Sequence, residues 1–396
     1  MSNLTDPSQP KNATSPVANF SDFVLDPTIL KAVAEQGYTQ ATPIQAKAIP
    51  IILEGQDVMG AAQTGTGKTA AFTLPIIQKL LPQANTSTSP ARHPIRALIL
   101  TPTRELSDQV AENASLYAKF THLRTAVVFG GVDIKPQTAI LRSGVEILIA
   151  TPGRLLDHIT SKTADLSQVQ ILVLDEADRM LDMGFLPDLQ RIINLIPSQR
   201  QTLLFSATFS PEIKKLAQTY LRNPVTIEVA RQNAAADTVN QMVYLVPNEN
   251  KRAAIISILQ NRMKSGLSQQ CIIFTNSRMG CARLANALER DGIKAAAIHG
   301  DKSQTERMAT LEGFKNGTID ALVATDVAAR GLDIPDMPCV INHELPFNAE
   351  DFIHRIGRTG RAGSKGDAIA LVDESEKRLL DDIEKLMKRK LPIGCL

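Results

Sequence analysis

Short apolar runs rich in β-branched residues recur along this chain and alternate with longer segments whose apolar residues follow helical spacing. In the first half the runs cover residues 97–100, 146–149, 171–174, 202–205 and 225–227. In the second half they cover residues 242–246, 271–275, 295–298, 321–324, 340–341 and 368–372. Strands that are apolar on both faces and separated by helices are typical of a parallel sheet covered on both sides. The pattern therefore predicts two α/β units in tandem.

Segments of different composition divide the 396 residues. Residues 1–18, rich in Ser, Asn, Thr and Pro, predict a disordered leader, and the polar stretch 82–94 predicts a long surface loop. The Ala-, Asn- and Gln-rich segment 230–237 interrupts the alternation and predicts an interdomain linker. We therefore expect one domain over residues 19–229 and a second over residues 238–396, both of ordinary domain length.

Composition narrows the classes of function. Hydrophobic residues make up 43% and charged residues 21%, as in globular proteins, and no apolar run reaches the roughly 20 residues of a membrane span. The net charge of +2 means that any nucleic-acid surface must be a local groove. Tryptophan is absent and aromatics are 4%, which disfavours broad base-stacking platforms. The four cysteines form no C-x-x-C pair, so we expect reduced thiols and a cytoplasmic location.

Residues 62–69, Ala-Gln-Thr-Gly-Thr-Gly-Lys-Thr, resemble the phosphate-binding P-loop, with alanine in place of its first glycine. Gly65 and Gly67 let backbone N–H groups turn toward an anion, and the helix that begins near Lys68 adds its positive end. Lys68 would reach the β- and γ-phosphates, and the Thr69 hydroxyl would join a magnesium shell. The same letters also fit an ordinary loop or a degenerate G-x-G-x-x-A dinucleotide fingerprint.

A second feature lies where the apolar run 171–174 ends in Asp175, Glu176 and Asp178. Acidic residues at the mouth of a buried strand suit a magnesium ion: Asp175 would hold the metal and Glu176 would take a proton from water. The alternative is a charged turn after a strand. In combination with the Lys68 loop, the acidic cluster favours hydrolysis of ATP or GTP.

Residues 354–361, His-Arg-Ile-Gly-Arg-Thr-Gly-Arg, place four basic residues around two glycines in the second half. Arg358 and Arg361 are three apart, so on one helical turn both guanidinium groups would face the same way. That arrangement suits arginine fingers that meet a γ-phosphate held by the other domain. On these residues alone, a solvated helix start and a contact with nucleic-acid phosphates remain alternatives.

Over residues 20–390 the motifs and their order resemble the DEAD-box RNA helicases of superfamily two, most closely the bacterial RhlE-type branch. Residues 175–178, Asp-Glu-Ala-Asp, match the family's namesake tetrad. The resemblance implies two tandem RecA-like domains, each a mainly parallel sheet flanked by helices, joined by a short linker. It also implies an RNA-stimulated ATPase that unwinds short RNA duplexes locally or remodels RNA–protein complexes. An ATP-gated RNA clamp or annealing factor carries the same motifs and stays an alternative.

The resemblance assigns residues to the ATP site, with ATP and Mg²⁺ as cofactors. Gln45 would read the adenine edge, since an amide both donates and accepts, and Phe20 would stack on the base. The ATP-binding set is Phe20, Gln45, Thr64, Gly65, Thr66, Gly67, Lys68, Thr69 and Asp333. Thr69 and Asp175 would hold Mg²⁺, largely through water. The catalytic set is Lys68, Asp175, Glu176, Arg358 and Arg361. The residues that couple nucleotide state to RNA are Asp178, Ser206, Thr208 and His354.

RNA is the partner that the resemblance implies. The matching positions are Arg104, Gly131, Thr151, Gly153, Arg154, Arg307 and Thr325. Glycines, hydroxyls and single arginines suit phosphate and sugar contacts, so we expect binding without base sequence preference. We further expect a monomer with no membrane association, and proteins of ribosome assembly or RNA decay as possible partners.

Overall fold

The computed structural model describes residues 18–61, 66–228, 239–329, 337–360 and 366–395. The predicted linker and nearly all of the predicted leader lie outside these residues. The chain divides into two compact units, and each is described by itself. The first unit comprises residues 1–129 and 134–229, and the second comprises residues 130–133 and 230–396.

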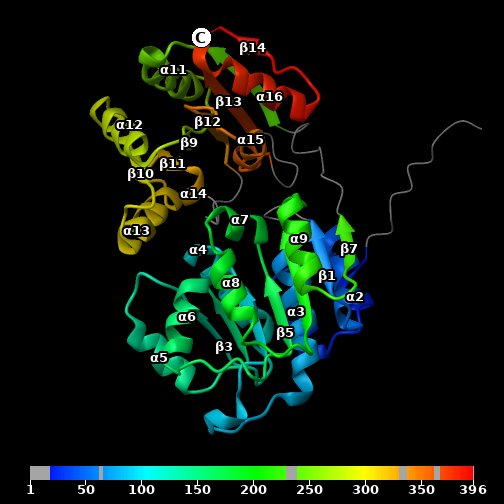
Figure 1. Cartoon of the computed structure of the whole chain (residues 1–396). Helices are drawn as coiled ribbons and strands as arrows, with labels where there is room; N and C mark the ends of the chain where they lie inside the picture. Colours follow the sequence, from blue (N-terminus) through cyan, green and yellow to red (C-terminus); the bar gives the residue numbers. More distant parts are fainter. Residues whose placement is uncertain (1–17, 62–65, 229–238, 330–336, 361–365, 396) are drawn as a thin grey trace, which may run out of the picture. The chain divides into compact units, whose positions relative to one another are not determined.

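The first unit is built on a seven-stranded sheet in which all neighbouring strands are parallel (Figure 1). Its order is β3-β4-β2-β5-β6-β1-β7. The strands are β1 (Val58–Ala61), β2 (Ala97–Leu100), β3 (Thr125–Val128), β4 (Ile147–Ala150), β5 (Ile171–Leu174), β6 (Gln201–Ser206) and β7 (Val225–Glu228). Every residue of β2, β4, β5 and β6 is buried, which explains the continuous apolar runs of β2, β4 and β5 and the apolar centre of β6.

Two hydrophobic clusters cover the two faces of this sheet, because alternate strand residues point to opposite sides. One face packs against α1 (Pro27–Glu35), α2 (Pro43–Leu53), α3 (Lys68–Leu80) and α4 (Arg104–Ala118). The other packs against α5 (Ile134–Arg142), α6 (Pro152–Thr160), α7 (Ala177–Asp182), α8 (Leu186–Ile193) and α9 (Pro211–Tyr220). This confirms the predicted sheet with helices on both faces.

The second unit repeats this plan with strand order β10-β11-β9-β12-β13-β8-β14, again parallel throughout. Its strands are β8 (Val239–Leu245), β9 (Cys271–Thr275), β10 (Ala295–Ile298), β11 (Ala321–Thr325), β12 (Cys339–Asn342), β13 (Gly366–Val372) and β14 (Ile393–Gly394). Its helices are α11 (Lys251–Lys264), α12 (Arg278–Arg290), α13 (Gln304–Lys315), α14 (Asp326–Ala329), α15 (Ala349–Ile356) and α16 (Lys377–Met387). Both predicted α/β units are therefore present.

The strand β1 is missing from the predicted runs, because its sequence Val-Met-Gly-Ala carries little β-branched character. Packing explains the glycine: a Cβ at Gly60 would lie 2.7 Å from the Phe205 ring on the neighbouring strand β6. The lack of a side chain at Gly60 therefore lets β1 pair with β6 directly beside the Phe205 ring.

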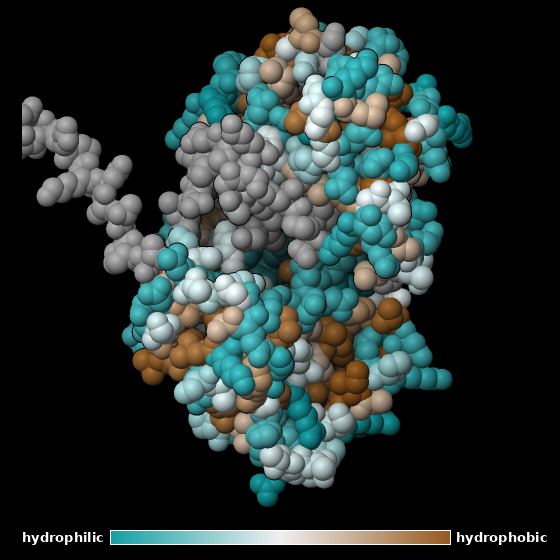
Figure 2. All heavy atoms as spheres, turned by 180° about the vertical axis from the view of Figure 1, so that it is seen from behind, coloured by the Kyte–Doolittle hydropathy of each residue, from teal (hydrophilic) through white to brown (hydrophobic). Residues whose placement is uncertain are grey.

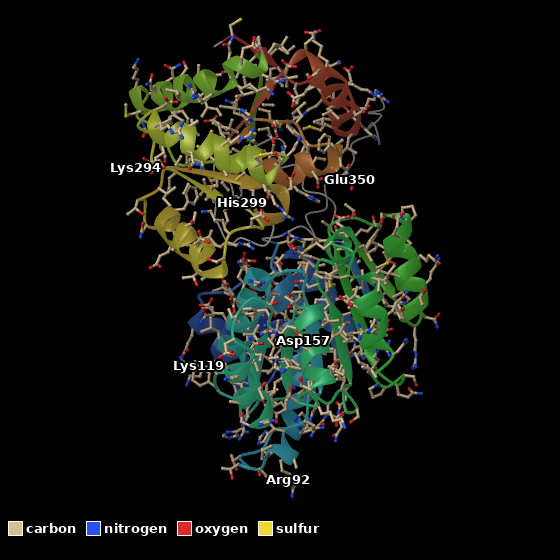
Figure 3. The ribbon with its side chains drawn as sticks, turned by 60° about the vertical axis from the view of Figure 1, so that its left-hand side comes forward. Arg92, Lys119, Asp157, Lys294, His299 and Glu350 are labelled. Atoms are coloured by element: carbon tan, nitrogen blue, oxygen red, sulfur yellow. The ribbon has the colours of Figure 1, made fainter. Side chains whose placement is uncertain are left out.

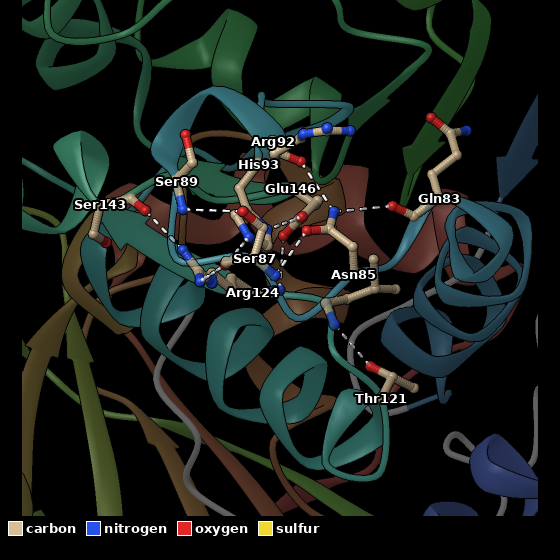
Figure 4. Close-up of polar contacts among 11 residues, drawn as sticks. Gln83, Asn85, Ser87, Ser89, Arg92, His93, Thr121, Arg124, Ser143 and Glu146 are labelled. Carbon is tan, nitrogen blue, oxygen red and sulfur yellow. Dashed lines mark hydrogen bonds and ion pairs between the residues drawn. The ribbon is translucent and has the colours of Figure 1, made fainter.

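The segment predicted as a long loop, residues 82–94, ends in a buried polar cluster (Figure 4). His93 and Glu146 are fully buried, with 2.5 Å between His93 Nδ1 and Glu146 Oε1. His93 Nε2 donates to the Ser87 carbonyl at 2.7 Å, and the Arg124 backbone N–H donates to Glu146 Oε2 at 2.9 Å. The loop is therefore attached to the amino ends of β3 and β4 by satisfied polar groups.

Three of the four cysteines are buried and one is exposed, and all four are free thiols. Burial raises the pKa of Cys271 well above its usual range, that of Cys281 to about 11 and that of Cys339 to about 12. These thiols therefore stay protonated at neutral pH, whereas Cys395 is open to solvent.

On the face shown in Figure 2, polar residues cover most of the surface and apolar residues form small separate patches. Among the helices that the structure describes, none combines the length and the apolar character needed to span a bilayer.

Candidate nucleotide-binding site and RNA-facing residues

The phosphate end of the candidate site lies where β1 leads into α3. Thr64 and Gly65 lie outside the described residues, but Thr66 and Gly67 are described and directly precede Lys68, the first residue of α3. Gly67 has φ +87°, and a Cβ there would lie 2.4 Å from Gln45 Nε2. Both the backbone conformation and the close contact require glycine at this position.

Lys68 and Asp175 form a buried ion pair, with 3.7 Å between Lys68 Nζ and Asp175 Oδ1. Their side chains are 6% and 2% exposed. Asp175 follows β5, so the structure brings the P-loop lysine and the first carboxylate of the tetrad to the same edge of the sheet. Burial raises the pKa of Asp175 to about 6; Lys68 opposes this rise, and Glu176 and Asp178 add to it. An additional cation beside Asp175 would relieve this cost.

Glu176 occupies the tight turn between β5 and α7. Its φ is +51° and its ψ is +53°, a left-handed conformation that non-glycine residues adopt rarely. Its backbone N–H donates to Asp175 Oδ1 at 3.0 Å, and its Oε2 lies 3.9 Å from Arg179 Nη1. Strained backbone conformations of this kind concentrate at functional sites, where the surrounding structure holds them.

The residues predicted to couple nucleotide state to RNA meet at the end of β6. Asp178 Oδ2 accepts from the Ala207 backbone N–H at 3.1 Å and from Thr208 Oγ1 at 3.5 Å. Ser206 Oγ donates to the Thr208 carbonyl at 2.7 Å. The structure thus brings Asp178, Ser206 and Thr208 together. His354 belongs to the second unit, where its Nδ1 lies 3.9 Å from Asp351 Oδ1.

A cavity of about 380 Å³ in the first unit connects Lys68, Asp175 and Glu176 with the predicted adenine-binding residues. Of the predicted site residues, its lining includes Phe20, Gln45, Gly67, Lys68, Thr69, Asp175 and Glu176. The other lining residues are Tyr38, Gln40, Thr42, Ala70, Leu106, Gln109, Asn113 and Tyr117. The volume falls within the range of ligand pockets in proteins.

Gln45 is held rigidly at this cavity. Its Oε1 accepts from the Thr42 backbone N–H at 2.8 Å, and its Nε2 donates to the Gly67 carbonyl at 3.1 Å. A glutamine amide has two N–H donors and two carbonyl lone pairs, so these contacts use one of each. One donor and one acceptor remain for a base edge, and their orientation is fixed. Phe20 is buried, with its ring at an edge-to-face angle to Phe23.

The structure of the second unit contradicts one prediction about the basic segment, residues 354–361. Helix α15 ends at Ile356, so Arg358 lies in the turn that follows and not on a helical turn. Gly357 ends the helix, and the Thr359 hydroxyl donates to the Met337 carbonyl. The prediction that Arg358 sits on a shared turn of helix with Arg361 was therefore wrong. Arg361 lies outside the described residues, as does Asp333.

Arg355 has a role that the sequence analysis missed. Only 1% of it is exposed, and it donates from Nε and Nη2 to both carboxylate oxygens of Asp326 at 2.6 Å. It also donates to Asn342 Oδ1, the Glu344 carbonyl and Asn276 Oδ1, and its guanidinium lies 5.0 Å from the Phe274 ring centroid. A signal was available: Arg355 lies between Phe352 and Ile356 on the buried face of an amphipathic helix.

Predicted RNA contacts in the first half of the chain follow the strands β2, β3 and β4. Arg104 begins α4, and Thr103 caps that helix by accepting from the Leu106 N–H at 3.4 Å. Gly131, with φ +79°, comes after β3, and Thr151 comes after β4. These positions follow the carboxyl ends of neighbouring parallel strands, as Asp175 does.

The remaining predicted RNA contacts lie on helices and at a strand end. Gly153 is exposed near the start of α6, where an added Cβ would meet no atom within 4 Å. Arg154 Nε lies 3.5 Å from Oδ2 of Asp157, labelled in Figure 3. In the second unit Arg307 lies on α13, and Thr325 is the buried last residue of β11.

A P-loop lysine and a buried carboxylate at the carboxyl edge of a parallel sheet define the class of P-loop α/β proteins. Comparisons with known proteins refine this class. Residues 42–216 match the family model of the DEAD/DEAH box helicases, and residues 250–363 match the helicase conserved C-terminal domain.

Individual relatives agree with the family models. The chain is 44% identical over 368 residues to the DEAD-box ATP-dependent RNA helicase RhpA of Helicobacter pylori strain B128, covering 93% of this chain and 72% of RhpA. It is 42% identical over 375 residues to the ATP-dependent RNA helicase CshA of Listeria monocytogenes, covering 95% and 70% of the two chains. The structure of S. cerevisiae Dbp5 bound to RNA and ADP BeF3 is similar with a TM-score of 0.82 at 30% identity, covering 95% of each chain.

The chain therefore belongs to the DEAD-box ATP-dependent RNA helicase family. This confirms the predicted family and the tandem RecA-like fold. The narrower RhlE-type branch stays a prediction.

Proposed function

We propose that this protein uses the cavity of the first unit to bind ATP and couples ATP hydrolysis to local separation of short RNA duplexes. The observation that carries the proposal is the convergence of Gln45, Lys68, Asp175 and Glu176 on one cavity of about 380 Å³. Relatives named as ATP-dependent RNA helicases, and Dbp5 bound to RNA and ADP BeF3, support it.

Each residue around the cavity has a separate task in this proposal. Gln45 binds the adenine edge, and Lys68 binds the β- and γ-phosphates together with the backbone of residues 62–67. Asp175 and Thr69 would hold Mg²⁺, which neutralises phosphate charge; the raised pKa of the buried Asp175 carboxyl suits a nearby cation. Glu176 orients the attacking water and accepts its proton.

The second unit contributes positive charge in this proposal. Arg358 and Arg361 would stabilise the charge that develops on the γ-phosphate, and Asp333 would contact the nucleotide. Arg355 holds Asp326, Asn276 and Asn342 in place and so fixes the end of α15 from which Arg358 follows. In this proposal Arg355 therefore has a structural role and Arg358 has a catalytic one.

RNA binding and ATP binding reinforce each other in this scheme, because both favour the same domain arrangement. Arg104, Thr151 and Gly153 contact the RNA backbone from the first domain, and Arg307 and Thr325 contact it from the second. Asp178, Ser206 and Thr208 relay the nucleotide state. The proposal includes domains over residues 19–229 and 238–396, a 230–237 linker, and a cytoplasmic monomer that acts with proteins of ribosome assembly or RNA decay.

The test uses the full chain, with ATP turnover measured alone, with single-stranded RNA and with DNA of the same sequence. Strand displacement is followed with a fluorophore and quencher on a short and on a long RNA duplex. We expect turnover that depends on RNA, and separation of the short duplex alone. Undetectable RNA-stimulated turnover would overturn the proposal. Turnover without strand separation would favour an annealing clamp, and equal stimulation by DNA would favour a DNA translocase.

A further inference from the structure

Helix α4 presents a row of side chains to the nucleotide cavity that the predicted ATP-binding set does not contain. Leu106, Gln109, Asn113 and Tyr117 all line the cavity, and their spacing of three, four and four residues places them on one face of the helix. The cavity is therefore walled by the N-terminal segment on one side and by α4 on another.

Internal contacts hold this row in a defined arrangement. Asn113 Nδ2 donates to the Gln109 carbonyl at 2.8 Å, and the Tyr117 hydroxyl donates to Asn113 Oδ1 at 3.4 Å. These bonds use one amide donor and one amide lone pair of Asn113, so a second of each remains. Tyr117 is 2% exposed, so its ring is fixed in the core, and its hydroxyl holds the Asn113 amide at the cavity.

Charge is distributed unevenly around the cavity. All of its charged lining residues, Lys68, Asp175 and Glu176, lie at the phosphate end near the start of α3. The side chains that α4 contributes are amides, a phenol and a leucine, and the N-terminal segment adds Phe20, Tyr38 and Gln40. A nucleoside triphosphate has the same division, with charged phosphates at one end and an uncharged base and ribose at the other.

We propose that Gln109 and Asn113 of α4 contact the base or ribose of the bound nucleotide, with Tyr117 as the positioning residue behind them. The inference rests on the proposed ATP site and extends it, because it assigns a share of nucleotide affinity to α4 in addition to Gln45. Amides both donate and accept, so they can contact ribose hydroxyls as well as base edges.

The experiment measures the dissociation constant of a fluorescent ADP analogue without RNA, and KM and kcat for ATP with RNA. Gln109→Ala and Asn113→Ala remove the proposed contacts, and Tyr117→Phe removes only the hydroxyl and keeps the ring in the core. We expect both alanine variants to raise the dissociation constant and KM about five- to tenfold with kcat nearly unchanged, as for the loss of one hydrogen bond. Tyr117→Phe should give a smaller rise of the same kind.

Tyr220→Phe is the matched control, because Tyr220 ends α9 on the other face of the sheet and packs against the hydrophobic cluster of that face. It should leave the dissociation constant and KM unchanged. A second readout is the KM for GTP divided by the KM for ATP. This ratio should fall in the Asn113→Ala and Gln109→Ala variants if the two amides contact the base. It should stay constant if they contact the ribose.

Two results separate this inference from the proposed function. If the unaltered protein hydrolyses ATP but the folded alanine variants bind the analogue within twofold of it, the role of α4 is overturned and the ATPase proposal stands. A fall in kcat with an unchanged dissociation constant would also overturn it. If the unaltered protein neither binds the analogue nor hydrolyses ATP, the proposed function itself fails.

Discussion

Two buried pairs of ionisable side chains lie at opposite ends of the strands of the first sheet, and they differ in how fully their polar atoms are bonded within the protein. At the amino edge, both Glu146 oxygens and both His93 ring nitrogens have partners within the protein. At the carboxyl edge, Lys68 and Asp175 lie 3.7 Å apart beside a cavity, and the pKa of Asp175 is raised to about 6. Ionisable side chains are buried at both edges, so burial alone does not identify a site. An ion pair beside a cavity, in which the carboxyl group has a raised pKa, does identify one.

Two arginines of the second unit, both buried, occupy different positions. Arg355 is surrounded by Asp326, Asn342 and Asn276, and its guanidinium lies near the Phe274 ring. Arg358 lies three residues further on, in the turn after α15. A basic segment that looks uniform in sequence therefore contains one arginine that holds the fold together and another that we assign to catalysis.

The largest effect is expected at the carboxyl edge. Glu176→Gln keeps the size and the left-handed turn of Glu176 but removes the base, so RNA-stimulated ATP turnover should fall about 10²- to 10⁴-fold. The temperature midpoint of unfolding should hardly change. Steady-state phosphate release and thermal unfolding measure the two quantities. A normal rate in Glu176→Gln would remove Glu176 from the chemistry.

The reverse outcome is expected at the amino edge. Glu146→Ala leaves His93 and the Arg124 backbone N–H without their buried acceptor, which should lower the free energy of unfolding by about 3 kcal/mol. ATP turnover below the unfolding transition should remain normal. Urea unfolding gives the free energy. If turnover instead fell as it does in Glu176→Gln while the protein stayed folded, the distinction between the two edges would be lost.

In the second unit, lysine substitutions separate the two arginines. Arg355→Lys keeps the charge but loses the planar fork that contacts both oxygens of Asp326, and should destabilise the protein by about 2 kcal/mol. Arg358→Lys should lower kcat about tenfold or more and change stability less than Arg355→Lys does. Chemical unfolding and RNA-stimulated turnover of both variants check this. Equal loss of stability in both would mean that Arg358 is also structural.

The smallest effect tests whether a raised pKa alone marks a site. Burial, aided by Glu105 and Glu112, raises the pKa of Asp108 on α4 from 3.8 to about 6. The folded pKa lies above the unfolded one, so this carboxyl lowers stability as pH rises from about 4 to 6, and the cost is complete above that window. Because Asp108 is only half-buried, Asp108→Asn should stabilise the protein by only about 1 kcal/mol at pH 7.5, and less at pH 5. Urea unfolding at both pH values measures this difference; nucleotide affinity should stay unchanged.

Local sequence patterns predicted much of the fold. Strands such as β5 and β9 were predictable because strands buried on both faces are rich in apolar residues at consecutive positions. The strand β1 was not, because Gly60 is required by contact with Phe205, which is distant in sequence. Lys68, Asp175 and Glu176 lie in short contiguous motifs and could be recognised there.

Other features depend on tertiary contacts that no local pattern encodes. The pairing of His93 with Glu146 joins residues 53 positions apart. Gln109, Asn113 and Tyr117 look like ordinary polar and aromatic positions of an amphipathic helix until the N-terminal segment packs beside them to enclose a cavity. The position of Arg358 beyond α15 also depends on the Thr359 contact with Met337.

The distribution of the cysteines offers a direct way to watch the two units in solution. Cys271, Cys281 and Cys339 are buried and protonated, so a maleimide dye at neutral pH would modify Cys395 alone. A second dye on a cysteine introduced at the exposed Asn194, between α8 and β6, would create a donor–acceptor pair spanning the units. Energy transfer between these dyes, recorded on single molecules as ATP and RNA are added, would report the distance between the domains. Neither dye would lie on a residue that we assign to nucleotide binding or RNA binding.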